Sequence, residues 1–146
     1  MIHEKAKTGD ADAMINWGVE HLLAIVDQEF SREYAYPKWM DEVDASELLC
    51  YALYWFEQAL STKISEAYYW IGESCNVYDY CNQGAGSYAS IFWDNAKKNV
   101  RIKEIVKNNP NSIISRILSG KDVCYFLGRE YLAKSAEMGI RQHSMC

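Results

Sequence analysis

The chain has 146 residues, of which 49% are hydrophobic, 24% charged and 14% aromatic, and its net charge is −5. This length and hydrophobic content exclude a disordered protein and predict one domain over residues 1–146 with a sizeable core. No apolar run approaches the ~18 residues that a membrane helix needs, and residues 1–10 lack the apolar part of a secretion signal. We therefore expect a cytoplasmic protein that has no membrane partner.

The sequence shows no recognisable site for catalysis, a metal or a cofactor. The five cysteines lack the spacing of a zinc site or a disulfide framework, so we expect free thiols, most simply buried ones. The three histidines are scattered, and the GxSxG, HExxH and GxxxxGK[ST] motifs are absent. We predict no catalytic residue, no metal and no cofactor.

The charge is divided unevenly along the chain. Residues 1–80 hold 15 of the 20 acidic and 5 of the 15 basic residues, a balance of −10, whereas residues 81–146 have a balance of +5. This division is either ordinary solvated surface or an acidic face directed at a basic partner. An acidic face would repel phosphate, so no nucleic-acid partner is expected there.

The first predicted helix follows Asp10, a good N-cap residue, and carries apolar residues at helical spacing to Ile25. Residues 27–44 have no sustained helical period and predict an acidic, aromatic loop. Its rings either pack onto the helices or anchor a partner. The partner-binding candidates in this loop are Tyr34, Tyr36, Trp39, Asp41, Glu42 and Asp44.

Residues 51–72 predict two amphipathic helices joined by a polar turn at residues 61–63, with Ser65 as the cap of the second. Tyr69 and Glu73 lie off the apolar stripe of the second helix, where they either pack against a neighbouring unit or complete the binding surface. Residues 76–88 predict a loop, and residues 87–107 a long helix with a basic exposed face. After Pro110, Asn111 or Ser112 caps a further helix, and Gly139 marks the end of the last one.

Apolar positions recur at the same offsets. Ala13, Trp17 and Gly18 lie at +4, +8 and +9 from Gly9, as Ala67, Ile71 and Gly72 do from Lys63. A weaker third copy has Gly120 at +9 from Asn111. Phe56 and Leu132 are matching positions of the other helix of the unit. Small residues on facing stripes allow two helices to approach closely, as a repeated helical hairpin requires.

The segments GDADAMINWG, ALYWFEQAL with EAYYWIG, and YLAKSAEMG resemble the Sel-one-like branch of the tetratricopeptide repeats. The spacings between Gly18, Gly72 and Gly120 exceed the usual unit of that family, and Lys63 and Leu60 replace its usual small residues. The resemblance implies an all-α, right-handed solenoid of about three helix-turn-helix repeats. We place its units at about residues 1–60, 61–107 and 108–146.

The resemblance also implies a surface that binds proteins and has no enzymatic activity. Together with the acidic, aromatic loop, it suggests a small bacterial inhibitor, an immunity protein that neutralises a basic toxin such as a nuclease. A secretion chaperone or a scaffold of the same fold is the alternative. An uncharacterised enzyme is the third possibility.

Overall fold

The computed structural model describes residues 2–30, 36–81 and 91–139, which form α-helices and short 3-10 helices without any β-strand. The predicted all-α class is therefore confirmed. In this part of the chain, no helix combines the length and the apolar character that crossing a membrane requires. The helices are α1 (Ile2–Lys7), α2 (Ala11–Phe30), η1 (Lys38–Glu42), α3 (Ala45–Ala59), α4 (Ile64–Cys81), α5 (Asp94–Lys98), α6 (Val100–Asn108), α7 (Ile113–Leu118) and α8 (Cys124–Glu137).

Polar side chains begin several helices by accepting backbone N–H groups that lack a helical partner. The Asp10 carboxylate accepts the Ala13 N–H at 3.0 Å, and the Ser112 hydroxyl accepts the Ser115 N–H at 3.2 Å. Both caps confirm the sequence predictions. The predicted cap at Ser65 is wrong, because α4 already begins at Ile64.

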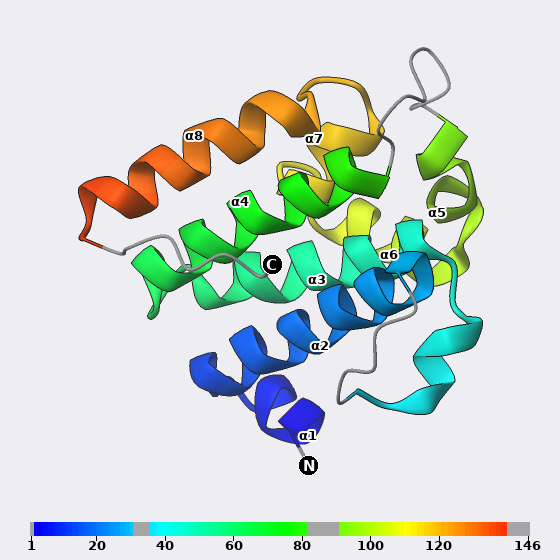
Figure 1. Ribbon diagram of the computed structural model, residues 1–146, viewed down its shortest axis with the longest axis horizontal. Helices are drawn as coiled ribbons and strands as arrows, with labels where there is room; N and C mark the ends of the chain where they lie inside the picture. The colour runs from blue at the N-terminus through cyan, green and yellow to red at the C-terminus, as the bar shows by residue number, and fades with distance from the viewer. Residues whose placement is uncertain (1, 31–35, 82–90, 140–146) are drawn as a thin grey trace.

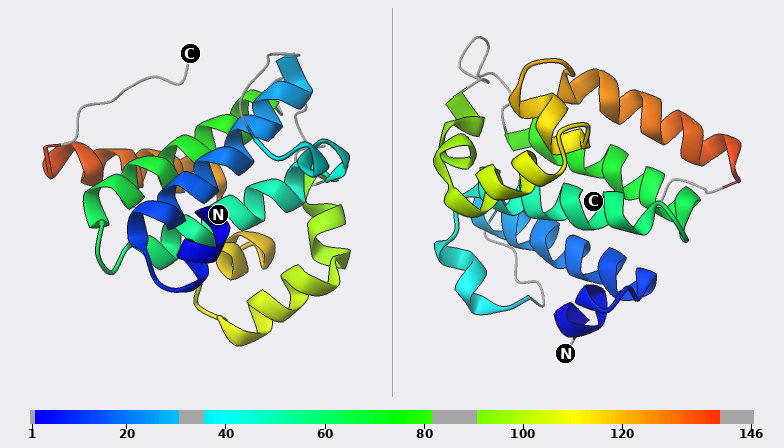
Figure 2. Two further views of the ribbon diagram at one scale, coloured as in Figure 1. Left: turned by 90° about the horizontal axis from the view of Figure 1, so that it is seen from below. Right: turned by 180° about the vertical axis from the view of Figure 1, so that it is seen from behind.

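Five helices lie side by side in the order α8, α4, α3, α2 and α1, and each packs on the next (Figure 1). Helices α6 and α7 lie on the other face of this row, in front of α3 and α4 when the protein is seen from behind (Figure 2, right). One cluster of buried hydrophobic residues extends from Ala6 in α1 to Leu127 in α8. The row and its covering helices therefore share one core.

Two helix pairs in the row touch through a glycine. A Cβ added at Gly18 of α2 would lie 2.4 Å from the Phe56 ring of α3, and one at Gly72 of α4 would lie 2.5 Å from Leu132 Cγ of α8. Both distances are far below van der Waals contact, so glycine is required for these helices to pack as they do. The close helix approach predicted at Gly72 is confirmed, and the contacted residues, Phe56 and Leu132, are the matched positions of the sequence pattern.

Gly120 behaves differently from the other two glycines. Helix α7 ends at Leu118, and Gly120 follows it with φ +82° and no atom within 4 Å of an added Cβ. It follows the end of α7 and does not contact a neighbouring helix, so the weaker third copy of the pattern does not provide an equivalent glycine contact. Gly139, with φ +87° just after α8, ends its helix as predicted.

The prediction of one long helix over residues 87–107 is also wrong for the residues of this range that the structure describes. The chain leaves helical geometry at Asn99, with φ −72° and ψ 129°, between α5 and α6. The Asn99 side chain accepts the Ile102 N–H at 3.1 Å and so begins a new helix. Residues 82–90 lie outside the described part of the chain.

Both predicted loops contain more helix than their sequences indicated. Helix α2 continues to Phe30 and η1 covers Lys38–Glu42, so residues 27–44 are not an irregular loop throughout. Helix α4 continues to Cys81, six residues into the loop predicted at 76–88. Lys38, Asp41 and Glu42 in η1 and Asn76 in α4 are exposed, and such polar residues weaken the apolar period from which helices are predicted.

Gly72→Val is expected to destabilise the protein by about 1–3 kcal/mol, because the new side chain overlaps Leu132 and approaches the Gly128 carbonyl oxygen. Urea denaturation followed by circular dichroism measures the change. The double variant Gly72→Val with Leu132→Ala serves as the control. It should lose less stability than the sum of the two single variants, because the smaller side chain makes room. An unchanged midpoint for Gly72→Val would contradict this contact.

Candidate functional site

An open groove of about 540 Å³ lies between the row of helices and α6. Helices α1 and α2 with η1 form one side, α3 forms the floor and α6 forms the other side, as the view from below shows (Figure 2, left). Five of its twelve lining residues are tryptophan or tyrosine, and His21 adds a sixth ring. The lining residues are Lys7, Trp17, His21, Trp39, Tyr51, Tyr54, Trp55, Arg101, Glu104, Ile105, Asn108 and Asn109.

The rings form two groups along the groove. At the η1 end, the Trp17 ring lies 4.8 Å from His21 and 6.2 Å from Trp39, and His21 lies 5.9 Å from Tyr51, all between ring centroids. About one turn further along α3, Tyr54 and Trp55 meet edge to face at 5.0 Å. Trp39 is 54% exposed, so a large apolar ring faces solvent at the mouth of the groove.

His21 lies among the rings at the η1 end and is only 2% exposed. Its Nδ1 lies 2.7 Å from the Trp17 carbonyl oxygen. A carbonyl only accepts hydrogen bonds, so Nδ1 carries the proton. Burial lowers the pKa of His21 to about 4, although the hydrogen bond to Trp17 opposes this shift. His21 is therefore uncharged at neutral pH and is a weak base there.

Helix α6 presents Arg101, Glu104, Ile105 and Asn108 to the groove. These residues are spaced i, i+3, i+4 and i+7, which places them on one face of the helix. The next residue, Asn109, donates its side-chain amide to the Ile105 carbonyl oxygen at 2.9 Å. The basic face predicted for this region is exposed at Lys97, Lys98, Arg101, Lys103 and Lys107, and of these only Arg101 lines the groove.

Of the predicted partner-binding residues that the structure describes, only Trp39 lines the groove. Tyr36 is 8% exposed, and its hydroxyl contacts a carboxylate oxygen of Asp27 in α2 and, at 2.5 Å, one of Asp41 in η1. The hydrogen bonds to these carboxylates raise the pKa of Tyr36. Tyr36 therefore connects η1 to α2 through these hydrogen bonds. It is not exposed, so it does not offer a ring to a partner. Tyr34 lies outside the described residues.

The predicted acidic residues of this segment have different surroundings. Asp41 and Glu42 are exposed on η1, beside Trp39 in the chain. Asp44 accepts the Ser46 N–H at 2.9 Å as the N-cap of α3 and the Asn95 side-chain amide at 2.9 Å. Partial burial raises the pKa of Asp44, but the hydrogen bonds from Ser46 and Asn95 outweigh it and leave that pKa below its ordinary value. Asp44 thus has a structural role in addition to its charge.

Tyr69 and Glu73 lie on α4, which contributes no residue to the groove. Tyr69 is 5% exposed and packs edge-on against Trp70, so of its two predicted alternatives the structure shows packing. Glu73 accepts the Asn76 side-chain amide at 3.1 Å, and burial raises its pKa. The structure therefore does not join these two residues to the η1 segment in one surface.

The groove includes residues that the sequence analysis did not select. Trp17 and Trp55 lie at helical spacing among apolar residues, a pattern that predicts a buried helix face and not a groove. Tyr51, Tyr54 and Trp55 follow the i, i+3, i+4 pattern of one helix face, which was the available signal for the floor. No signal in the sequence placed α6 opposite this floor.

Cys50, Cys75 and Cys124 are buried free thiols, as predicted, and burial raises the pKa of the Cys50 thiol. Among the residues that the structure describes, no group of three or more histidine, cysteine or acidic side chains is placed to hold a metal ion. Comparison of the chain with protein-family models, curated proteins and solved structures gives no match.

His21→Gln is expected to make stability less dependent on pH between about 4 and 6.5. In the wild type, the unfolded state binds a proton in this range that the folded state excludes, so stability falls as the pH falls. The loss reaches up to about 3 kcal/mol at the lower end of this range. Glutamine can still donate to the Trp17 carbonyl but does not titrate. Urea denaturation at several pH values measures both proteins, and parallel pH profiles would contradict the burial of a neutral His21.

Proposed function

We propose that this chain is a non-enzymatic protein-binding module that receives a segment of its partner in the aromatic groove. The observation that carries the proposal is the open groove of about 540 Å³, whose mouth exposes 54% of Trp39. Tryptophan and tyrosine are good interface anchors, because they offer large rigid surfaces at little cost in side-chain entropy. The groove also offers charged and amide groups that can orient a bound chain.

The packing supports a repeat array of the Sel-one-like kind. The α2–α3 and α4–α8 pairs make the same type of close contact, from a glycine of one helix to matched residues of the other, Phe56 and Leu132. We therefore propose a short right-handed solenoid of two equivalent pairs, in which residues 94–118 are inserted within the second pair, between α4 and α8. A groove between the helices of such an array is suited to binding polypeptides.

We further propose that the partner is basic, as a toxin neutralised by an immunity protein would be. Asp41 and Glu42 are exposed on η1 at the mouth of the groove, and the first 80 residues carry a balance of −10. This charge would attract a basic protein over a long range and orient it before contact. The anchors at the groove would then set the lifetime of the complex.

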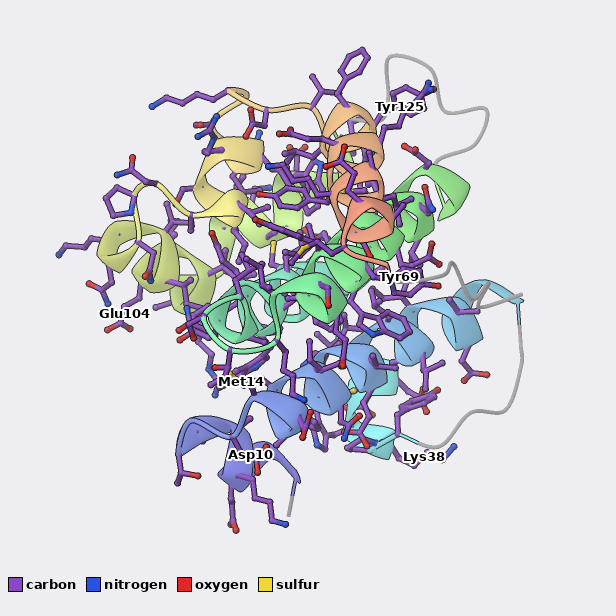
Figure 3. The ribbon with its side chains drawn as sticks, turned by 90° about the vertical axis from the view of Figure 1, so that its left-hand side faces the viewer. Asp10, Met14, Lys38, Tyr69, Glu104 and Tyr125 are labelled. Atoms are coloured by element: carbon purple, nitrogen blue, oxygen red, sulfur yellow. The ribbon has the colours of Figure 1, made fainter. Side chains whose placement is uncertain are left out.

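A photo-reactive phenylalanine analogue in place of Trp39 tests the groove directly. In an extract that contains the natural partner, we expect one predominant cross-linked protein, identified by mass spectrometry. The same analogue at Tyr125 is the matched control. Tyr125 is exposed on α8, at the opposite end of the protein from Lys38 and η1 (Figure 3). A partner captured only from Tyr125 would contradict the proposal.

With the partner in hand, Glu42→Lys is expected to slow association several-fold at low salt and to weaken its salt dependence, while dissociation changes little. Glu42 is preferable to Asp41 for this test, because Asp41 holds Tyr36. Stopped-flow binding measures both rates. Glu137→Lys, which makes the same change at an exposed position at the end of α8, is the control. Equal association rates for both variants would contradict a basic partner that docks at η1.

A further inference from the structure

We infer that the groove binds a proline-rich segment of the partner in the polyproline II conformation. This inference rests on the proposed function and specifies the chemistry of the bound segment. It follows from two features of the lining: its aromatic surface and its excess of hydrogen-bond donors.

The lining presents mostly donors. Trp39, Tyr54 and Trp55 carry indole N–H or hydroxyl groups, and Lys7 and Arg101 carry only donors. Glu104 is the single carboxylate of the lining. Proline residues have no backbone N–H, so a proline-rich segment offers carbonyl oxygens and few donors. The partial negative charge of these carbonyls complements a lining that holds two cations and one anion.

The rings stand at angles that leave surfaces for a proline ring to contact. Tyr54 and Trp55 are nearly perpendicular, at 87°, and Trp17 and Trp39 meet at 58°. Aromatic-lined grooves with rings that project from the surface are a recurring way to bind polyproline II segments. Such a segment is already extended before binding, so it loses little conformational entropy.

The test uses two fluorescently labelled synthetic peptides of equal length, one alternating alanine with proline and the other alternating alanine with glycine. Fluorescence anisotropy with the full chain should show at least about tenfold tighter binding of the proline peptide, and Trp39→Ala should weaken this binding about tenfold. Tyr125→Ala, which changes an exposed ring on α8, should leave the binding unchanged. Circular dichroism of each variant confirms that it is folded.

Equal affinity for the two peptides, or no binding of either, would overturn the inference, and so would binding that Trp39→Ala leaves unchanged. The proposed function is tested separately by the cross-link at position 39. If that cross-link captures a partner through a segment without proline, the protein-binding function stands and this inference fails. If the cross-linked segment is proline-rich, both are supported.

Discussion

The fold depends on the close approach of helices at glycine residues. In the α4–α8 pair, a Cβ on Gly72 would lie 3.1 Å from the Gly128 carbonyl oxygen, and one on Gly128 would lie 2.7 Å from the Cys75 Cβ. Two backbones therefore meet with no side chain between them. At Gly18 of α2, by contrast, the Phe56 ring of α3 occupies the space that a side chain would take. These contacts fix the row of helices whose α3 forms the floor of the groove, and the positions of the floor rings depend on them.

Some residues of the η1 segment, at the mouth of the groove, are buried and stabilise the fold, whereas others are exposed to solvent. The Tyr36 hydroxyl hydrogen-bonds Asp27 and Asp41, and the Met40 side chain is completely buried. These contacts fix the position of η1 against the row of helices. Trp39 lies between these anchors in sequence but points to solvent over the groove. A ring held on a fastened element loses little freedom when a partner binds, which favours affinity. In the proposed function, the acidic, aromatic segment would therefore contribute both to the core and to recognition of the partner.

Sequence patterns predicted the parts of the fold that depend on local chemistry. The helix class, the caps at Asp10 and Ser112 and the close contact at Gly72 follow from periodicity, capping and residue size. The break at Asn99 was missed, because the residues on both sides continue a helical pattern. The groove could not be predicted, because it arises where α6 lies opposite α3, far away in the sequence. Trp39 was selected for its residue type, but its exposure depends on the buried contacts of its neighbours.

The central claim is that the partner occupies the aromatic groove, and the five tryptophan indole N–H groups provide a direct measurement of it. Trp17, Trp39 and Trp55 line the groove, whereas Trp70 and Trp93 do not. Two-dimensional ¹H–¹⁵N NMR of the labelled chain, titrated with the partner captured at position 39, resolves each indole signal after assignment by single substitution. We predict that the signals of the three groove tryptophans shift and that those of Trp70 and Trp93 stay in place. Shifts confined to Trp70 and Trp93 would contradict the account.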